Sequence, residues 1–561
     1  MTTLAIETLA VQTPSIAYSR LAPMLIVFGA AVVSVLVEAA LSAAPGVTGA
    51  SAAAVSRLRH RIQLTLASAA LVVAFVGVVV LALRGTEAES TVSGAVVIDG
   101  PSLFLQGTVL LLSIAAVAFM GERRLDRVWA PTEVHTAAGL RVAADGTGRP
   151  DDDLPADAFT PAAATVPGSP DELAAARFAI TTEVFPLTLF AVGGMMLFGA
   201  CGDLLTMFIA LEVLSLPLYL LCGLARRRRL LSQEASLKYF LLGAFASAVF
   251  LFGAAFAYGA TGTLALDGIG RALAHGSADR TLALIAVVLV SVGLLFKVGA
   301  VPFGSWVPDV YQGAPTPVTA LMASATKVAA FGALLRVLHV GFAPLEPDWR
   351  MPMWAVAIAT MVIATFMAVT QSDVKRMLAY SSVSHVGFAL VGAITLGTAG
   401  IGSTLFYVAG YALAAFGGFA LLAVVRDGTG REEAALSAWA GLGRRRPLVG
   451  LLMSLFLLSF AGIPLTSGFI GKFVVFAAAG GYGAWTLVLV GVLCSAVAAY
   501  FYVRVIVSMF FAEAPDEAPD VLTPSALTTV PIGVCAAATA FLGFFPQPLL
   551  DLAAAAGDFL S

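Results

Sequence analysis

The chain has 561 residues, of which 59% are hydrophobic and 12% are charged, and its mean hydropathy is +0.94. Soluble domains carry roughly 25% charged residues, so this composition excludes a soluble enzyme. The formal net charge is −3, which leaves no basic surface for nucleic acid. The four cysteines lie far apart without a CxxC pair and predict neither a metal site nor a disulfide: Cys201, Cys222, Cys494 and Cys535.

Apolar runs long enough to cross a hydrocarbon layer about 30 Å thick recur along the chain. Residues 1–21 lack the apolar core and cleavage site of a signal peptide, so the first helix is expected to remain in the mature protein. The sequence predicts an all-α, polytopic membrane protein. Its fourteen expected spans are 22–43, 63–84, 101–121, 181–200, 203–224, 234–259, 281–304, 316–340, 352–370, 375–396, 402–425, 447–477, 482–511 and 525–544. Because this number is even, both termini are expected on one side.

Arginines predict the orientation, because cytoplasmic loops retain Lys and Arg. They gather in loops that follow odd-numbered spans: Arg57, Arg59 and Arg61; Arg123, Arg124 and Arg127; Arg226–Arg229; Lys375 and Arg376; and Arg444–Arg446. These loops are predicted to be cytoplasmic, with both termini outside. The loop after the thirteenth span is acidic, but acidic residues count little in this rule.

The segment 122–177 is the only long polar stretch, and it is rich in Ala, Pro, Asp and Thr. No apolar periodicity runs through it, so we expect a cytoplasmic and largely disordered insertion. A role in binding a partner stays open.

Two spans carry Gly and Pro in mid-membrane: LLFKVGAVPF in the seventh and LLSFAGIPLTSGF in the twelfth. Gly299 with Pro302, and Gly462 with Pro464, mark candidate breaks in these helices. The two spans lie an odd number of spans apart, so they cross the bilayer in opposite senses. This pattern is typical of an inverted repeat, in which ion sites form at the breaks. Two ordinary proline kinks are the alternative.

Lysine is rare in this chain, and its placement indicates proton transfer. Of the 31 Lys and Arg residues only five are lysines, and four of them fall inside predicted spans: Lys238, Lys297, Lys327 and Lys472. Each charge at a helix centre costs about 2.5 to 3.5 kcal/mol. Arginine stays charged, whereas a lysine can release its proton. Pairing with a carboxylate or with carbonyl groups is the structural alternative for each lysine.

Glu212 and His385 are expected near the membrane midplane with Lys327, counting about 1.5 Å of helix per residue. Glu212 is the only acid deep in the middle spans, so it is the expected partner of Lys238 or Lys297. His385 suits a proton relay, because the unperturbed pKa of histidine is about 6.5. A histidine that is simply hydrogen-bonded inside the bundle is the alternative.

These residues lie in segments that resemble a known family, the antiporter-like membrane subunits of respiratory complex I. The resemblance covers roughly residues 180–510 and is carried by GDLLTMFIALEVLSLPLYLL (202–221), EASLKYFLLGAFASAVFLFG (234–253), FKVGAVPFGSWVPDVYQGAPTPVTALMASATKVAAF (296–331), DVKRMLAYSSVSHVGF (373–388) and GIPLTSGFIGKF (462–473). The form PDVYQGAPTPVTA is more similar to the N-type subunit than to the L and M types or to the cation/proton antiporters.

The resemblance implies about fourteen transmembrane helices with two inverted five-helix repeats, formed by spans 4–8 and 9–13, and with helices 7 and 12 broken. The expected divisions are N-terminal helices 1–3 (1–121), the insertion (122–177), a first repeat (178–340), a second repeat (341–511) and a C-terminal loop with helix 14 (512–561). Motif by motif, proton-transfer roles carry over to Glu212, Lys238, Lys297, Lys327 and Lys472. The insertion departs from the short loop usual in the family, so no role carries over to it.

The expected function is proton translocation, coupled to quinone reduction in other subunits of an NADH-quinone oxidoreductase. The resemblance implies no cofactor or metal in this chain, with NADH, FMN, iron–sulfur clusters and quinone elsewhere in the complex. The implied partners are the antiporter-like M-type subunit, small K-, J- and A-type subunits and the lipids of a bacterial plasma membrane. A subunit of a multi-subunit cation/proton antiporter without a redox partner, and a passive scaffold between pumps, are the alternatives.

Shortening 130–170 to a Gly/Ser linker is expected to leave turnover of the host complex near normal. A disordered segment has no core to lose, and a flexible linker of similar reach closes the same gap. The measurement is quinone reductase activity per assembled complex. Failure of the shortened chain to assemble would instead identify the segment as a docking element.

Overall fold

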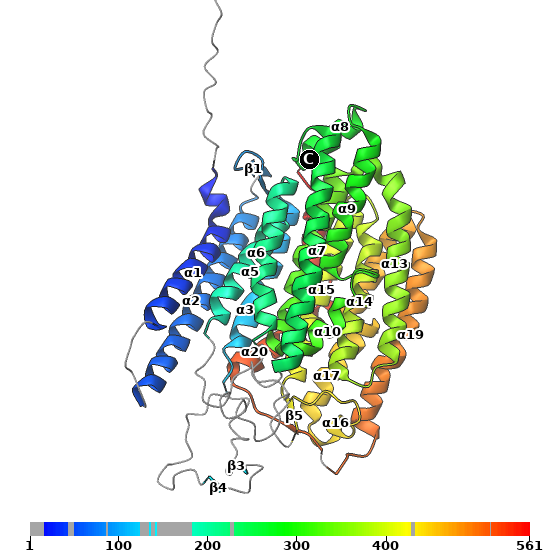
Figure 1. The fold of residues 1–561 in the computed structure, drawn as a ribbon. Coiled ribbons are helices and arrows are strands. Elements are labelled where there is room, and N and C mark those ends of the chain that lie inside the picture. Colours follow the sequence, from blue (N-terminus) through cyan, green and yellow to red (C-terminus); the bar gives the residue numbers. More distant parts are fainter. Residues whose placement is uncertain are drawn as a thin grey trace, which may run out of the picture.

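The computed structural model describes residues 16–42, 50–85, 88–123, 134–135, 141–142, 182–224, 229–427, 432–516 and 518–560. Nearly all of these residues lie in one helical bundle (Figure 1). Most of the predicted insertion lies outside the described residues. Within it the structure describes one antiparallel pair of two-residue strands, β3 (Val134–His135) and β4 (Arg141–Val142).

Three helices and a hairpin form the N-terminal part: α1 (Tyr18–Ser42), α2 (Ala50–Leu83), β1 (Glu89–Thr91), β2 (Val96–Ile98) and α3 (Gly100–Met120). Asp99 caps α3, and its carboxylate accepts a hydrogen bond from the Ser102 backbone N–H at 3.0 Å. The Ser102 hydroxyl accepts one in return from the Asp99 N–H at 2.8 Å. This reciprocal capping box fixes the start of the helix.

The next helices comprise α5 (Val184–Phe198), α6 (Leu204–Cys222), α7 (Arg229–Thr261), α8 (Leu266–Ala274), α9 (Arg280–Val298), α10 (Trp306–Gly313), α11 (Thr316–Ala323), α12 (Ala325–Arg336), the π-helical turn η1 (Val337–Gly341) and the 3₁₀ turn η2 (Ala343–Leu345). They cover predicted spans 4–8. The predicted seventh span (281–304) covers α9 and the break after it, and helix 7 continues past the expected end as α10. The eighth span is divided into α11 and α12.

The C-terminal half comprises α13 (Glu346–Val369), α14 (Val374–Ala393), α15 (Thr398–Leu422), β5 (Val425–Arg426), α16 (Leu442–Arg445), α17 (Pro447–Ala461), α18 (Ser467–Gly481), α19 (Trp485–Phe511), β6 (Asp520–Val521), α20 (Ala526–Phe544) and α21 (Gln547–Ala555). Predicted spans 9–14 are all present. The twelfth is divided into α17 and α18, and β5 pairs with β6.

Among the described residues, 11 helices are long and apolar enough to cross a membrane. The three other predicted spans correspond to the shorter helix α5, to the polar helix α14 and to the divided pair α17–α18. Each predicted span therefore matches a helix or a divided helix. The all-α, polytopic fold predicted from the sequence is confirmed.

The two five-helix repeats show the same local structure at opposite ends of the bundle. Asp203 starts α6 and forms a β-bridge with Ala265, and Asp373 starts α14 and forms a β-bridge with Ala435. Both aspartates cap their helices by accepting a backbone N–H. Ala265 directly precedes α8, whereas Ala435 lies between β5 and α16, at the other end of the molecule (Figure 1). The repeats are therefore inverted.

Helices 7 and 12 are broken in the same way. Gly299 ends α9 and Gly462 ends α17 in the left-handed conformation, with φ of 85° and 80°. The next amide closes each turn: Ala300 N–H bonds to the Leu295 carbonyl at 2.9 Å, and Ile463 N–H bonds to the Leu458 carbonyl at 3.0 Å. Glycine tolerates this conformation without strain, which makes it the usual helix C-terminus. These sites are true interruptions and not proline kinks.

A third interruption lies in helix 8. Ser324 separates α11 from α12 with φ −115° and ψ −86°, outside the helical region. Its hydroxyl donates to the Ala320 carbonyl at 2.6 Å. No Gly or Pro marks this position, which is why the sequence predicted a continuous span.

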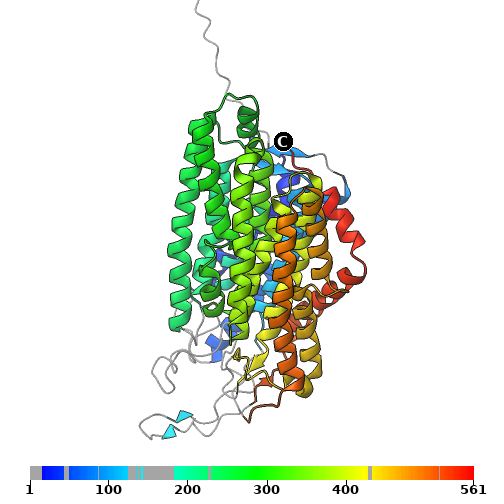
Figure 2. The ribbon, with the colours of Figure 1, turned by 90° about the vertical axis from the view of Figure 1, so that its right-hand side faces the viewer.

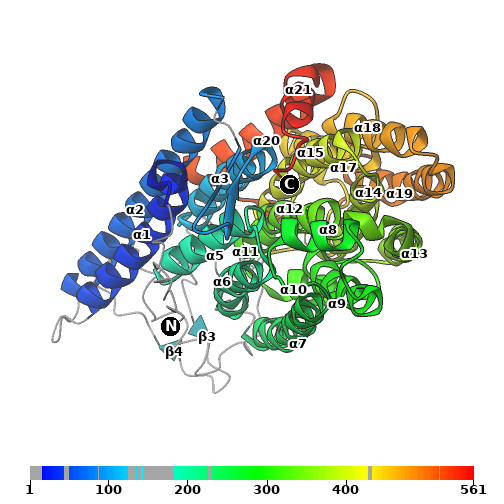
Figure 3. The same cartoon turned by 90° about the horizontal axis from the view of Figure 1, so that it is seen from above.

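The centre of the bundle is formed by α11, α12 and α15. Side chains of these helices are almost all buried. Helices α1, α2, α7, α13 and α19 lie at the periphery (Figure 3), and α21 lies on the side opposite α7 (Figure 2). A buried centre surrounded by exposed apolar helices is the arrangement expected of a membrane bundle.

The two described ends of the chain lie together. Ala17 N–H donates to Thr91 Oγ1 at 2.9 Å, and Leu560 N–H donates to Asp99 Oδ2 at 3.2 Å. Thr91 and Asp99 belong to the β1–β2 hairpin and its junction with α3. Both ends of the described chain are therefore attached to the same end of the bundle, as an even number of spans requires.

Candidate functional site

Lys297 lies in the last turn of α9, immediately before the break of helix 7. Its side chain is only 3% exposed. The Nζ atom donates to Ser215 Oγ at 2.6 Å and to Tyr239 Oη at 3.2 Å. Lys297 is thus held by neutral hydroxyl groups of α6 and α7.

Glu212 lies one turn before Ser215 on α6 and is half-buried. It is close enough to Lys297 for an electrostatic interaction, but in the described part of the chain no salt bridge joins it to any lysine. It shares the outward face of α6 with four exposed apolar residues: Leu205, Ile209, Leu216 and Leu220. The expected direct pairing of Glu212 with Lys238 or Lys297 is not formed, because Ser215 occupies the position next to the Lys297 ammonium.

Lys238 lies near the start of α7 and not in the interior. Its side chain is 41% exposed and forms ion pairs with Glu234 at 2.6 Å and Asp309 at 2.8 Å. Two carboxylates and solvent access stabilise a permanent ammonium ion there. The structure therefore separates Lys238 from the buried lysines with which the sequence grouped it.

Lys327 lies one turn after the interruption of helix 8, at the centre of the molecule. It is 3% exposed, and its Nζ donates to the Ser382 carbonyl of α14 at 2.8 Å. Two buried hydroxyl groups belong to the neighbouring Thr326 and to Ser382, whose carbonyl Lys327 contacts. Neither Thr326 Oγ1 nor Ser382 Oγ has a hydrogen-bond partner among the described residues. Buried polar atoms without a protein partner are commonly satisfied by ordered water.

His385 lies in α14 between hydroxyl groups of two other helices. Its Nδ1 is 2.6 Å from Tyr407 Oη, and its Nε2 is 3.4 Å from Tyr502 Oη. The imidazole stacks on Tyr411 with 4.7 Å between ring centroids. Both ring nitrogens therefore contact groups that can donate or accept a proton.

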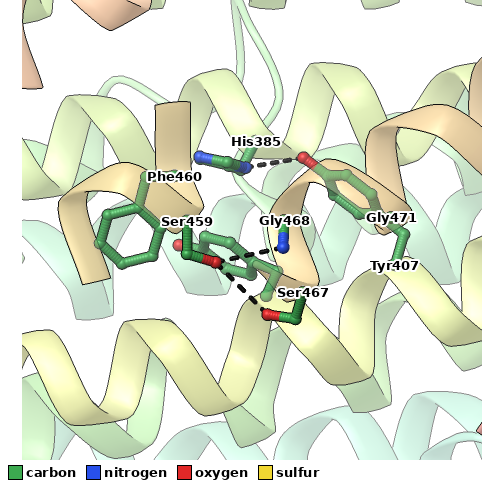
Figure 4. A pocket seen from close by; sticks show the side chains of 8 residues that line it. His385, Tyr407, Ser459, Phe460, Ser467, Gly468 and Gly471 are labelled. Atoms are coloured by element: carbon green, nitrogen blue, oxygen red, sulfur yellow. Dashed lines mark hydrogen bonds between the residues drawn. The ribbon is translucent and has the colours of Figure 1, made fainter. Parts of the chain in front are cut away.

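A small cavity lies beside His385, between α14, α15 and the break of helix 12 (Figure 4). His385 and Tyr407 point toward each other on one side, and Ser459 and Ser467 lie across from them (Figure 4). Ser459 Oγ is 3.3 Å from Ser467 Oγ and accepts from the Gly468 N–H at 3.1 Å. The cavity has room for about one water molecule.

Lys472 of α18 reaches back to the end of α17. Its Nζ donates to the carbonyls of Phe460 at 2.9 Å and Ala461 at 3.0 Å, and to Ser495 Oγ at 2.8 Å. The carbonyl end of a helix carries partial negative charge, which stabilises a cation. The break of helix 12 thus provides Lys472 with acceptors that an intact helix would have used internally.

The inverted repeat relates these two groups of residues. Ser215 follows Asp203 by twelve residues, and His385 follows Asp373 by twelve. Lys297 binds Ser215 in the first repeat, and Lys472 lies close enough to His385 for an electrostatic interaction in the second. Lys327 is also close enough to His385 for an electrostatic interaction.

Sequence reasoning missed two buried ion pairs, Asp99–Arg336 and Lys375–Glu432. Lys375 was grouped with the cytoplasmic loop charges, but its side chain is 1% exposed and lies 3.2 Å from Glu432, which is 2% exposed. A lysine two residues after a helix N-cap gives no signal of burial, and Glu432 comes from a loop. No group of three His, Cys, Asp or Glu side chains is placed to hold a metal in the described part of the chain.

Comparison with known proteins identifies the family. The family described as NADH:quinone oxidoreductase/Mrp antiporter, TM, matches residues 201–498. NADH-quinone oxidoreductase subunit N of Rhodococcus opacus (strain B4) is 59% identical over 98% of this chain and 97% of its own length. That similarity extends through the N-terminal helices, which the resemblance in the sequence did not reach.

Solved structures share the fold. A chain of respiratory complex I from Thermus thermophilus is 29% identical, with a TM-score of 0.70 over 95% of this chain and 99% of its own. A chain of the Mrp complex from Dietzia sp. DQ12-45-1b is 22% identical, with a TM-score of 0.74 over 97% of each chain, and it shows the fold alone. The chain belongs to the NADH:quinone oxidoreductase/Mrp antiporter transmembrane family, and within it to the relatives named NADH-quinone oxidoreductase subunit N.

Proposed function

We propose that this chain is a proton-translocating membrane subunit of an NADH-quinone oxidoreductase. One observation carries the proposal: Lys297, Lys327 and Lys472 are buried, and none of them has a carboxylate partner among the described residues. A buried ammonium that is not directly paired with a carboxylate is destabilised by desolvation. Such a group can lose and regain a proton when a nearby charge changes.

Each residue has a separate role in the proposed proton path. Glu212 is the variable charge beside Lys297, and Lys327 is the central carrier between the repeats. His385 relays protons between Lys327 and Lys472 through its tyrosine partners. The breaks at Gly299–Pro302 and Gly462–Pro464 expose backbone groups to the path. Lys238 is retained only as an electrostatic partner of Asp309 at the edge of the bundle.

The proposed host is a multi-subunit complex in a bacterial plasma membrane. Both termini lie on the outer side, and the arginine-rich end that carries β5 and α16 is cytoplasmic. The partners are an M-type antiporter-like subunit and small K-, J- and A-type subunits. NADH, FMN, iron–sulfur clusters and quinone are bound by other subunits. The domain boundaries at 121, 177, 340 and 511 follow the repeat pattern.

Affinity purification of the tagged full-length chain from native membranes tests this proposal. Co-purification with flavin- and iron–sulfur-containing subunits, and NADH-driven proton pumping by the reconstituted complex, are expected. Co-purification with other antiporter-like subunits, and sodium/proton exchange without NADH oxidation, would support the antiporter function instead. The matching family model, whose description also names the Mrp antiporter, makes that the second candidate.

Glu212→Gln is expected to lower proton pumping and coupled quinone reduction several-fold while the complex still assembles. The amide is nearly isosteric, so the change removes a charge beside Lys297 and little packing. The measurement is pumping per assembled complex in inside-out vesicles. Asp279→Asn at the exposed start of α9 is the matched control and should be silent. Wild-type pumping by Glu212→Gln would remove Glu212 from the proposed path.

A further inference from the structure

Lys375, Glu432 and Thr316 form a closed ring of buried polar groups. Lys375 Nζ lies 3.2 Å from Glu432 Oε1 and donates to Thr316 Oγ1 at 2.7 Å. The Thr316 hydroxyl in turn donates to Glu432 Oε2 at 2.5 Å. All three side chains are less than 5% exposed. We call this group the junction ring.

The junction ring connects three separate parts of the chain. Lys375 belongs to the first turn of α14, Glu432 to the segment that follows β5, and Thr316 to the first turn of α11. Lys375 Nζ also donates to the Ala314 carbonyl at 3.2 Å, at the end of α10. The ring therefore holds the short junction between α10 and α11, which is where helix 7 passes into helix 8.

Two further ion pairs hold α10 itself. Asp309 of α10 pairs with Lys238 of α7 at 2.8 Å and with Arg376 of α14 at 2.8 Å. Gln312 of α10 accepts from Arg376 at 2.8 Å. Lys375 and Arg376 are adjacent in α14. The buried Lys375 contacts the end of α10, and the partly exposed Arg376 contacts Asp309 within it.

The position of α10 and α11 depends on these contacts because neither is continuous with its neighbour. Non-helical residues separate α10 from α9, and Ser324 separates α11 from α12. A helix segment that is interrupted at both ends is not aligned by its own backbone hydrogen bonds. Lys327 lies in α12 just beyond the second interruption. Its hydrogen bond to the Ser382 carbonyl therefore depends on how α12 is oriented toward α14.

We propose, on the basis of the function proposed above, that Lys375 and Glu432 are positioning residues that fix the α10–α11 junction and thereby align Lys327 with α14. The pair acts through its mutual charge compensation and carries no proton itself. Removing one partner of a buried ion pair leaves an uncompensated charge, whereas replacing both with neutral residues is often tolerated.

The test compares Lys375→Met, Glu432→Gln and the double variant in the purified, reconstituted complex. Each single variant is expected to lower protons pumped per NADH oxidised by at least about tenfold. The double variant is expected to return to within about threefold of the wild-type value, because neither member of this pair is left buried without the other. The glutamine keeps an acceptor for the Thr316 hydroxyl.

A thiol reports the position of α11 directly. Cys222 Sγ lies 3.4 Å from Met322 Sδ of α11 and is buried. With the three other cysteines replaced, labelling of Cys222 by a membrane-permeant maleimide is expected to increase in both single variants and to fall back in the double variant. Asp520→Asn is the matched control, because it breaks an exposed ion pair with Arg446 at the same end of the bundle; pumping and labelling should not change.

Wild-type pumping by both single variants would overturn the proposal. So would a double variant as inactive as the single ones with Cys222 labelling unchanged throughout, because the pair would then itself carry protons.

If the single variants fail to assemble, Thr316→Val decides, since it opens the ring and keeps both charges. Reduced pumping with increased labelling supports the proposal, and wild-type values contradict it. Lys327→Met tests the proposed function separately, because wild-type pumping by that variant would refute the role of Lys327 whatever the ring does.

Discussion

Lys297→Met is expected to lower NADH-driven proton pumping by at least about tenfold in a complex that still assembles, the scale of losing a positioned proton-transfer group. Methionine fills a similar volume, but it removes the ammonium group that donates hydrogen bonds to Ser215 and Tyr239. The same substitution at Lys472 is expected to act alike, because that ammonium occupies the equivalent break in the second repeat. Pumping and quinone reduction are measured on the same reconstituted sample.

Arginine at either position separates charge from proton transfer. Lys297→Arg and Lys472→Arg keep a cation, but a guanidinium does not release its proton in proteins. We therefore expect the arginine variants to pump less than the wild-type complex, although they keep the positive charge that the methionine variants lack. Full activity of the arginine variants would show that a fixed positive charge is sufficient at these sites.

Asp99→Asn is expected to destabilise the assembled protein by about 3–5 kcal/mol, the cost of leaving one member of a buried ion pair alone. Asp99 pairs with Arg336 at 2.7 Å, and both side chains are 1% exposed. Asparagine caps a helix about as well as aspartate, so the change isolates the loss of charge from the loss of the α3 cap. The shift of the midpoint of thermal unfolding in detergent measures it.

Two further variants make this expectation specific. Asp348→Asn removes an ion pair with Arg280 in which the arginine is 66% exposed, and such pairs contribute less than about 1 kcal/mol. The double variant Asp99→Asn with Arg336→Met should recover part of the lost stability, because no unpaired guanidinium is left buried. A midpoint for Asp99→Asn as high as that of Asp348→Asn would show that water compensates Arg336.

The end of the bundle that carries β5 and β6 offers a comparison with an ion pair exposed to water. Arg446 donates a hydrogen bond to Asp520 and holds the pKa of that carboxyl below its usual range. The two side chains are about half exposed, so solvent screens the pair. Burial, and not the type of pair, separates Asp99–Arg336 and Lys375–Glu432 from Arg446–Asp520.

Local patterns in the sequence were sufficient for the spans and for two of the three helix interruptions. An apolar run of about 20 residues has one stable structure in lipid, since only a helix satisfies its own backbone there. The glycines at 299 and 462 are similarly local signals, because few other residues adopt the left-handed conformation that ends α9 and α17. The interruption at Ser324 carried no such signal and was missed.

The partners of the charged residues were decided only by the tertiary structure. Lys238 and Lys375 both follow the start of a helix, yet one is 41% exposed between two carboxylates and the other is buried against Glu432. Glu212 was expected to pair directly with a lysine, but Lys297 bonds instead to the Ser215 hydroxyl. Depth along a helix follows from counting residues, but the direction and neighbours of a side chain depend on how distant helices pack around it.

The sequence by itself therefore determined the number and order of the membrane spans, the inverted repeat and the placement of four of the five lysines inside spans, because each depends on short-range composition in an apolar solvent. The tertiary structure alone decided which buried lysines have no directly bonded carboxylate among the described residues, that His385 lies between two tyrosines, and that a ring of three side chains holds the junction between helices 7 and 8. Those features join residues that are far apart in the chain, and only packing brings them together.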